Sequence, residues 1–303
     1  MQPARRTFVR ALAAAAALAP LPHFAQPAPP TRRAIPSTGE QIPSIGVGTW
    51  LTFDAGVERT RRSALAPVLR AFFERGGTMI DSSPMYGSSE SVIGELLETL
   101  GRRDLAFAAT KVWTLGRGAG IGQMEASRKL WGVGRFDLLQ VHNLVDWSVH
   151  LRTLKAWKAE GRVRYVGLTT SHGRRHAELE RAMLREPLDF VQFTYSLADR
   201  DAESRLLPLA ADRGIAVIAN RPFDGGALFD RVRGQRLPEW AREADCANWA
   251  QVFLKFSVSH PAVTCAIPAT SRADHMLENM GALYGRLPDA ATRGRMARYF
   301  DAL

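Results

Sequence analysis

Four ionisable residues close or follow short apolar segments of the chain. Asp81 ends the segment TMID and Tyr86 follows it in SSPMYG, while Lys111 lies near the end of FAATKV and His142 ends LLQVH. A tyrosine with a pKa of about 10 is a weak acid at neutral pH, but an adjacent ammonium stabilises the phenolate and lowers that pKa. Lys111 beside Tyr86 would have this effect, and a buried lysine needs a carboxylate partner such as Asp81. With His142 donating a hydrogen bond to a substrate oxygen, the set predicts proton donation to a carbonyl group.

Each of these residues taken singly also fits a structural role, and it is their combination that indicates a site. The segments that would position them alternate between apolar runs and amphipathic stretches such as SALAPVLRAFFERG, which ends at Gly76, and ESVIGELLETLG, which ends at Gly101. Strand followed by helix, eight times over about 250 residues, predicts an α/β protein with a (β/α)8 TIM barrel. The strands are expected at Ile45–Trp50, Met79–Ile80, Leu105–Val112, Asp137–His142, Val163–Leu168, Phe190–Phe193, Ala216–Ala219 and Thr264–Ile267.

An open, doubly wound sheet is the competing arrangement. Such a sheet usually carries a glycine fingerprint after its first strand, and the segment GVGTW at residues 46–50 lacks the third glycine. The barrel is therefore favoured. In a barrel of this kind the functional groups lie at the carboxyl ends of the strands, which is where Asp81, Lys111 and His142 fall.

The composition is that of a globular protein with a full hydrophobic core. Of the 303 residues, 46% are hydrophobic and 23% are charged, and only two are cysteines, Cys246 and Cys265. Two cysteines are too few for a disulfide framework or a thiolate zinc site, and we expect no metal. The formal net charge is +10, but only five of the 40 basic residues are lysines, and the arginines are spread along the chain. We therefore expect no nucleic-acid partner.

Residues 1–30 are predicted to be a cleavable signal peptide and linker, and residues 31–303 a single barrel domain. The apolar stretch from Ala11 to Leu21 follows a basic segment and precedes a Pro-rich one, as in a secretory signal cut near Ala25. Eleven residues are too short to cross a membrane, which needs about 20, so membrane contact is expected only during export. Arg5 and Arg6 resemble the twin-arginine motif that exports folded proteins, and predict a periplasmic or otherwise exported location. A chance arginine pair before an alanine-rich stretch is the alternative.

From Pro36 to Leu283 the sequence resembles the aldo/keto reductase family, whose members are (β/α)8 barrel oxidoreductases that use a nicotinamide cofactor. The resemblance rests on an ordered set of segments: GVGTW, IDSSPMYGSSESVIGELL, TKV, FDLLQVHN, KAEGRVRYVGLT, FVQFTYS, GIAVIA and IPATS followed by LENM. It implies NADP as the usual cofactor, with NAD as the alternative. It also implies that hydride passes from the nicotinamide to the carbonyl carbon while Tyr86 protonates the oxygen. The family's four catalytic positions match Asp81, Tyr86, Lys111 and His142.

The resemblance also implies which residues bind the nicotinamide half of the cofactor. Gln192 matches the glutamine that holds the carboxamide, and Gly46 and Asp81 fall where the first loops pass the ribose and nicotinamide. Thr169 and Thr170 stand where relatives commonly have serine and asparagine, so one carboxamide hydrogen bond differs.

Two further positions depart from the family's pattern. Asn220 stands where relatives usually carry an aromatic ring that stacks on the nicotinamide, and loss of such stacking costs about 1–3 kcal/mol if it behaves like base stacking. Arg221 stands where a small polar residue usually meets the pyrophosphate, and a charge-assisted contact would offset part of that loss.

The segment IPATSRADHMLENM resembles the part of the family that binds the adenosine end. A helix beginning after Ser271, with ordinary capping, would present free N–H groups to a phosphate. Arg272 and His275 are expected to recognise a 2′-phosphate, which favours NADP over NAD. The residues implied for this end are Thr270, Ser271, Arg272, Glu278 and Asn279.

The expected function is NADP-dependent reduction of an aldehyde or ketone on a small molecule by a monomer. Because reduced nicotinamide is not expected to be regenerated after export, a dehydrogenase that retains its cofactor is an alternative. A binding or sensory barrel without turnover is another, and Asn220 is the feature that favours it. Trp50, Trp113 and the loop around Trp147 are candidate walls of a substrate pocket, and residues 225–237 are a candidate lid.

Overall fold

The computed structural model describes residues 29–303, whose core is a ring of eight parallel strands. The signal peptide, the arginine pair and the cleavage site predicted from the sequence fall on residues 1–28, outside this range. Each strand pairs with the next along the chain, and parallel bridges from Ile45 to Ala266 and from Gly48 to Ala269 join the last strand to the first. The strands of the ring are β3 (Val47–Gly48), β4 (Met79–Asp81), β5 (Phe107–Val112), β6 (Phe136–Val141), β7 (Val163–Thr169), β8 (Phe190–Thr194), β9 (Ala216–Asn220) and β10 (Val263–Ala266).

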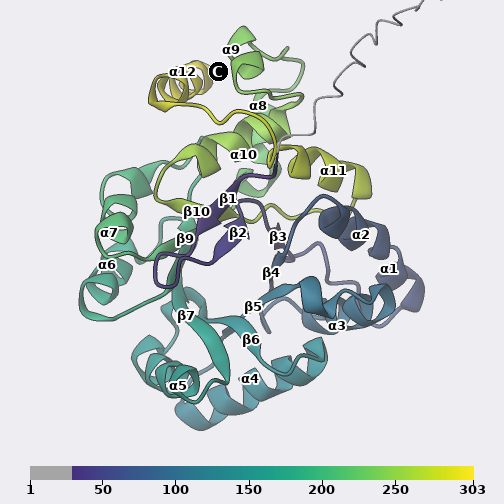
Figure 1. Cartoon of the computed structure of the whole chain (residues 1–303), viewed down its shortest axis with the longest axis vertical. Coiled ribbons are helices and arrows are strands. Elements are labelled where there is room, and N and C mark those ends of the chain that lie inside the picture. The colour runs from purple at the N-terminus through teal and green to yellow at the C-terminus, as the bar shows by residue number, and fades with distance from the viewer. Residues whose placement is uncertain (1–28) are drawn as a thin grey trace, which may run out of the picture.

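Helices surround the ring, as Figure 1 shows, and α8, α9 and α12 gather at one side of it. Among the described residues no helix combines the length and apolar character needed to span a membrane. The helices are α1 (Arg59–Ser63), α2 (Ala66–Glu74), α3 (Ser89–Leu100), α4 (Arg117–Trp131), α5 (Trp147–Ala159), α6 (His176–Arg185), α7 (Leu206–Asp212), α8 (Ala227–Arg231), α9 (Glu239–Glu243), α10 (Trp249–Ser259), α11 (Ala273–Gly281) and α12 (Ala290–Asp301).

The predicted (β/α)8 barrel is confirmed, and its eight strands lie where the apolar runs placed them, with shifts of a few residues at the ends. The glycine stops are also confirmed, because Gly101 caps α3 with a left-handed φ of 60° and Gly76 has a φ of 80° after α2. Leu105 and His142 belong to one-turn 3₁₀ helices beside the strands rather than to the strands themselves.

A short antiparallel hairpin, absent from the sequence prediction, covers the amino-terminal end of the barrel. It consists of β1 (Arg32–Ala34) and β2 (Gln41–Pro43), which lie in front of the ring in Figure 1. Ile35 and Ile42 are buried in one apolar cluster with side chains from the barrel strands, such as Phe107 and Tyr165. The hairpin therefore closes the end of the barrel opposite the strand termini that carry the predicted site.

A buried carboxylate joins the first turn of α3 to β5 and α4. Glu90 is 2% exposed, and its two oxygens accept hydrogen bonds from Thr110 Oγ1 (2.5 Å), Ser127 Oγ (2.7 Å) and Trp131 Nε1 (3.2 Å). Burial raises the pKa of Glu90, and the three donors only partly offset this. A carboxylate without these donors would be costly at such a position, so the three donors and Glu90 require one another.

We predict that Glu90→Ala lowers the free energy of unfolding by about 3 kcal/mol or more, because it leaves buried donors without an acceptor and opens a cavity. Glu90→Gln should lose at most about 1 kcal/mol, since its amide oxygen still accepts and its amide nitrogen can donate to Ser127. Urea unfolding at neutral pH measures both values. An alanine variant as stable as the wild type would show that Glu90 does not join α3 to α4.

The same pair of variants tests the protonation of Glu90. A raised pKa in the folded state means that folding favours the protonated acid. The contribution of Glu90 to stability is therefore full at acid pH and falls as the pH rises through the ordinary glutamate range towards the raised value. Relative to wild type, Glu90→Gln should gain stability from acid to neutral pH, and a constant difference between the two would contradict the raised pKa.

Candidate active site

The carboxyl ends of β4, β5 and β6 bring three of the predicted catalytic residues to one rim, and the loop after β4 adds the fourth. Asp81 is the last residue of β4, and Lys111 lies opposite Gln140 in the register of β5 and β6. Nζ of Lys111 is 2.5 Å from Oδ2 of Asp81 and 5.2 Å from the centroid of the Tyr86 ring. The Tyr86 and His142 rings meet edge to face with centroids 5.5 Å apart. The structure thus brings the four residues into one cluster.

The ion pair of Lys111 and Asp81 is fully enclosed, with side chains 0% and 2% exposed. Lys111 also donates to the backbone carbonyl of Ser82 at 2.8 Å. The second oxygen of Asp81 accepts from Nε2 of Gln192 at 3.1 Å and from Nε2 of Gln140 at 3.3 Å. Both charges are therefore compensated, and removal of either partner would leave an unpaired buried charge at a cost of about 3–5 kcal/mol.

For both Lys111 and Tyr86, burial shifts the pKa in one direction and the neighbouring group of opposite charge shifts it in the other. Burial disfavours the Lys111 ammonium, but the neighbouring Asp81 and Tyr86 outweigh it, and the pKa of Lys111 lies above its usual value. Burial raises the pKa of Tyr86, and Lys111 offsets only part of the rise. The prediction that the ammonium brings this pKa below its ordinary value is therefore wrong for the net shift, because desolvation of the phenolate is the larger effect. Tyr86 keeps its proton at neutral pH.

His142 is held neutral. Burial, with the charge of Lys111 added, lowers the pKa of His142 to about 2. A neutral imidazole has one donor nitrogen and one acceptor nitrogen, so the ring can donate a hydrogen bond but does not carry a positive charge. Nδ1 of the ring lies 2.8 Å from Oγ of the buried Ser83.

A cavity of about 470 Å³ opens at this rim. Trp50 contributes to its wall, whereas Trp113 and Trp147 do not. Lys111 is fully buried and does not line the cavity, whereas its neighbours Asp81 and Tyr86 do. The cavity is lined by eight of the residues predicted for catalysis or cofactor binding, namely Asp81, Tyr86, His142, Thr169, Thr170, Gln192, Asn220 and Arg221.

Gly46 does not line the cavity, contrary to the prediction. A Cβ added at Gly46 would lie 2.9 Å from the backbone oxygen of Met79 and 3.3 Å from Sγ of Cys265, inside the barrel wall. Gly48, two residues later, lines the cavity instead. The spacing of two keeps both glycines on one face of the strand, but only the second reaches the carboxyl rim.

The polar residues at the end of β7 to β9 are mostly engaged with one another. Thr169 Oγ1 accepts from the backbone N–H of Asn143 at 3.0 Å. The Asn220 side chain donates to the carbonyl of Thr170 and accepts from Thr194 Oγ1, both at 2.9 Å. Thr170 Oγ1 is buried and makes no hydrogen bond with any residue that the structure describes. Thr170 therefore has a hydroxyl whose hydrogen-bonding capacity is entirely left for a ligand.

Several lining residues were missed by sequence reasoning. Phe223 and Phe229, with ring centroids 4.9 Å apart, line the cavity beside Asn220 and Arg221. They place aromatic surface in the same cavity as Asn220, the position at which the family resemblance implies an aromatic ring. Phe229 falls in the segment 225–237 that the sequence indicated as a candidate lid, whereas Phe223 was missed, and its position just beyond the end of β9 was the available signal. The others are Thr49, Leu51, Thr52, Met85, Asn143, Ser171, His172, Arg174, Pro222 and Ile267.

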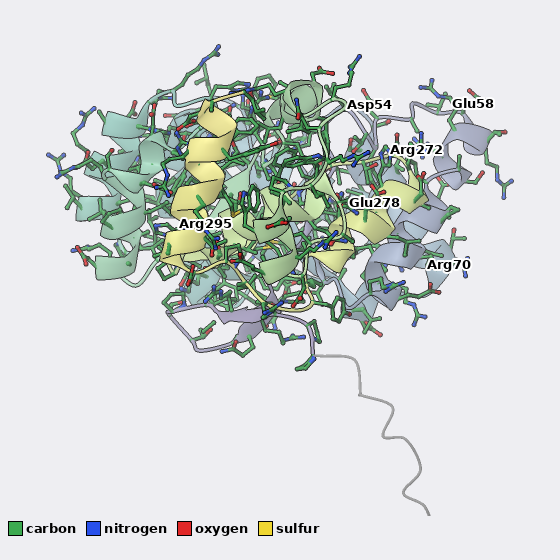
Figure 2. All side chains as sticks on the ribbon, turned by 90° about the horizontal axis from the view of Figure 1, so that it is seen from above. Asp54, Glu58, Arg70, Arg272, Glu278 and Arg295 are labelled. Atoms are coloured by element: carbon green, nitrogen blue, oxygen red, sulfur yellow. The ribbon has the colours of Figure 1, made fainter. Side chains whose placement is uncertain are left out.

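The residues predicted for the adenosine end lie beside this cavity rather than in its wall, where only Ile267 and Ala269 of that segment appear. Helix α11 begins at Ala273, with Arg272 as the N-cap residue, and no side chain caps its first turn. The expected capping by a side chain is therefore wrong, because Arg272 instead pairs with Asp274 at 2.5 Å and Thr270 Oγ1 accepts from the Arg272 N–H. Ser271 and Glu278 are exposed and Asn279 is buried. Arg272 and Glu278 lie together on this helix in Figure 2.

Comparison with solved structures places the fold among known reductases. One match is an aldo/keto reductase from Klebsiella pneumoniae, solved in complex with NADP and acetate, with a TM-score of 0.73 and 25% identity over 86% of this chain and 93% of that one. Another is the holo form of an aldo-keto reductase from Bacillus halodurans, with a TM-score of 0.73, 20% identity, and coverage of 89% and 96%.

Sequence comparison gives the same assignment. The chain is 29% identical to the methylglyoxal reductase YeaE of Escherichia coli over 260 residues, or 82% of this chain and 88% of that protein. It is 28% identical to the aldo-keto reductase YhdN of Bacillus subtilis over 226 residues, or 70% of this chain and 66% of that protein. The sequence pattern of the Aldo/keto reductase family matches residues 44–293. With its eight-stranded barrel and the cluster at the carboxyl rim, this chain belongs to the aldo/keto reductase family.

Proposed function

We propose that this protein reduces an aldehyde or ketone group of a small molecule to the alcohol, with Tyr86 as the proton donor. As a member of its family it is an NAD(P)-dependent oxidoreductase, and NADP is the cofactor. The observation that carries the proposal is the enclosed Asp81–Lys111 ion pair next to a protonated Tyr86 and a neutral His142 at the wall of one cavity. A relative named as a methylglyoxal reductase supports a small carbonyl substrate.

The residues of the cavity fit a nicotinamide cofactor. Thr170 Oγ1 is a buried polar atom without a partner in the described part of the chain, and with Gln192 it would hold the carboxamide. Arg221 would contact the pyrophosphate, because it lines the cavity. Among the described residues, its guanidinium forms an ion pair with Asp224 alone. Phe223 and Phe229 offer an apolar wall close to Asn220. When bound, the cofactor supplies the hydrogen and two electrons that the carbonyl carbon receives.

The protein's own residues would manage the proton. Burial keeps the proton on the Tyr86 phenol until a carbonyl oxygen gains negative charge beside it. Lys111 then stabilises the phenolate left on Tyr86, and Asp81 holds the ammonium in place. The neutral ring of His142 orients the same carbonyl oxygen through a hydrogen bond.

Two alternatives remain distinct from this proposal. Asn220, which is fixed by Thr170 and Thr194 and carries no ring, favours a barrel that binds a ligand without turnover. The opposing observation is that all four members of the catalytic cluster are present and in contact range. A dehydrogenase that retains its cofactor would use the same cluster in reverse.

We predict that Tyr86→Phe lowers kcat for carbonyl reduction by about 10²-fold or more, because it removes the proton donor. The phenyl ring keeps the shape of the site, so NADPH binding should stay within about twofold. Steady-state kinetics and fluorescence titration of the purified protein measure the two effects. Retention of more than a tenth of the wild-type kcat would show that Tyr86 is not the acid, and absence of any reduction by the wild type would favour the binding barrel.

Arg272 is proposed to recognise the 2′-phosphate of NADP. Arg272→Ala should weaken NADPH binding by about 10-fold, since a charge-assisted hydrogen bond is lost, and leave NADH binding nearly unchanged. Arg295→Ala is the matched control, because Arg295 is also an arginine paired with a carboxylate, Glu243, and lies on α12 away from Arg272 in Figure 2. Equal losses for NADPH and NADH in the Arg272 variant would exclude this role.

We also propose that residues 1–30 direct export through the twin-arginine pathway and that the mature chain, residues 31–303, works outside the cytoplasm as a monomer without a nucleic-acid partner. Replacing both Arg5 and Arg6 by lysine should retain the full-length chain in the cytoplasm of a bacterial host that has this pathway. Cell fractionation and N-terminal sequencing of the exported product measure the effect. Export of the double variant at the wild-type level would contradict the proposal.

A further inference from the structure

A buried serine hydroxyl touches the histidine of the catalytic cluster. Ser83 lies in the loop between β4 and α3, two residues after Asp81, and is 0% exposed. Its Oγ is 2.8 Å from Nδ1 of His142, which is itself 5% exposed. The reduction mechanism proposed above uses His142 but assigns nothing to Ser83.

The hydrogen bonds around Ser83 show which atom donates. A serine hydroxyl carries one proton and can accept two hydrogen bonds. The backbone N–H of Met85 donates to Oγ of Ser83 at 3.2 Å, so the hydroxyl already acts as an acceptor there. Within the described part of the chain, Nδ1 of His142 is the one acceptor for its proton. Because a buried hydroxyl rarely leaves its proton without an acceptor, Ser83 donates to Nδ1.

This donation determines the tautomer of His142. A neutral imidazole carries a single N–H, and a nitrogen that accepts from a hydroxyl cannot carry it. The proton of the ring is therefore on Nε2. Nε2 makes no hydrogen bond to a residue that the structure describes, and the ring lines the cavity next to Tyr86.

We propose that Ser83 is a positioning residue that holds His142 in its Nε2–H tautomer, so that the ring donates a hydrogen bond to the carbonyl oxygen of the substrate. The opposite tautomer would present the Nε2 lone pair to that oxygen, and two acceptors repel each other. The proposal deepens the reductase function given above and rests on it for the identity of the group that His142 faces.

Both ends of the Ser83–His142 contact are fixed by the backbone around them. On one side, Thr49 Oγ1 donates to the carbonyl of Asp81 at 3.0 Å and lies 2.9 Å from Oγ of Ser82, which holds the start of the loop. On the other side, Asn143 and Leu144 directly after His142 have left-handed φ values of 51° and 55°. Such values are uncommon for residues other than glycine, and they show that the surrounding structure holds the turn that aims the ring.

The tautomer is measured first, on the unaltered protein. Two-bond ¹H–¹⁵N correlation spectra of protein labelled with ¹⁵N-histidine distinguish a protonated ring nitrogen from an unprotonated one, and a His142→Asn variant assigns the signal. We expect His142 to show a protonated Nε2 and an unprotonated Nδ1 near neutral pH. A protonated Nδ1, or two tautomers in comparable amounts, would overturn the proposal. This measurement requires no substrate, so it is independent of whether the proposed reductase activity is found.

Variants of Ser83 test the consequence for turnover. Ser83→Ala should lower kcat by about 5- to 10-fold, the equivalent of one neutral hydrogen bond, without changing the dissociation constant of NADPH. Ser83→Thr retains a hydroxyl and should restore most of the loss. A wild-type kcat for Ser83→Ala, or a threonine variant no better than alanine while both bind NADPH normally, would overturn the positioning role.

The neighbouring serine supplies the matched control. Ser82 is equally buried, but its hydroxyl faces Thr49 and makes no contact with His142 among the described hydrogen bonds. Ser82→Ala should leave the His142 ring spectrum unchanged, whereas Ser83→Ala should shift the Nδ1 resonance through loss of the hydrogen bond. Equal changes of the spectrum in both variants would show that the effect is a general disturbance of the loop.

Discussion

The structure of the site depends on the ion pair of Lys111 and Asp81, two charges placed where water does not reach. A buried ammonium and a buried carboxylate are each unfavourable alone and are tolerated here because they compensate each other. The remaining hydrogen-bonding capacity of Asp81 is met by amide groups of Gln140 and Gln192. Asp81 lies on β4, Lys111 on β5, and the two glutamines on β6 and β8, so the charge balance of the site requires the register of the barrel from β4 to β8 to be correct.

The amino-terminal end and the carboxyl end of the barrel have different structural roles. At the amino-terminal end, the hairpin of β1 and β2 adds Ile35 and Ile42 to an apolar layer inside the strands. At the carboxyl end, polar side chains and loops leave a cavity. Because the amino-terminal end is closed by apolar packing, the polar groups of the interior are confined to one rim, which is the arrangement that allows a small ligand to meet all of them at once.

Desolvation is the common cause of the protonation states in the site. It raises the pKa of Tyr86 and lowers that of His142 to about 2, so the first keeps its proton and the second does not gain one. The two groups are therefore present at neutral pH as a neutral acid and a neutral hydrogen-bond donor. The positive charge nearby is confined to Lys111, where Asp81 stabilises it. In the proposed reduction, the site holds one proton for transfer and one fixed ammonium that favours the resulting phenolate.

The sequence by itself determined the strand and helix order, the family, and the four residues of the cluster at the carboxyl rim, because these depend on local periodicity and on side-chain types at strand ends. The tertiary structure decided what depends on distance and burial. It placed Gly48 rather than Gly46 at the cavity, supplied Phe223 and Phe229 beside Asn220, and left α11 without a side-chain cap.

The net rise in the pKa of Tyr86 and the contact of Ser83 with His142 were also beyond sequence reasoning. A pKa reflects the balance of desolvation against nearby charge, and both terms are set only when the chain has folded around the group. Ser83 and His142 are 59 residues apart in the chain, and nothing in either local pattern indicates that they meet. The types of the groups proposed for catalysis can thus be read from the sequence, whereas their protonation and orientation follow from the packing that encloses them.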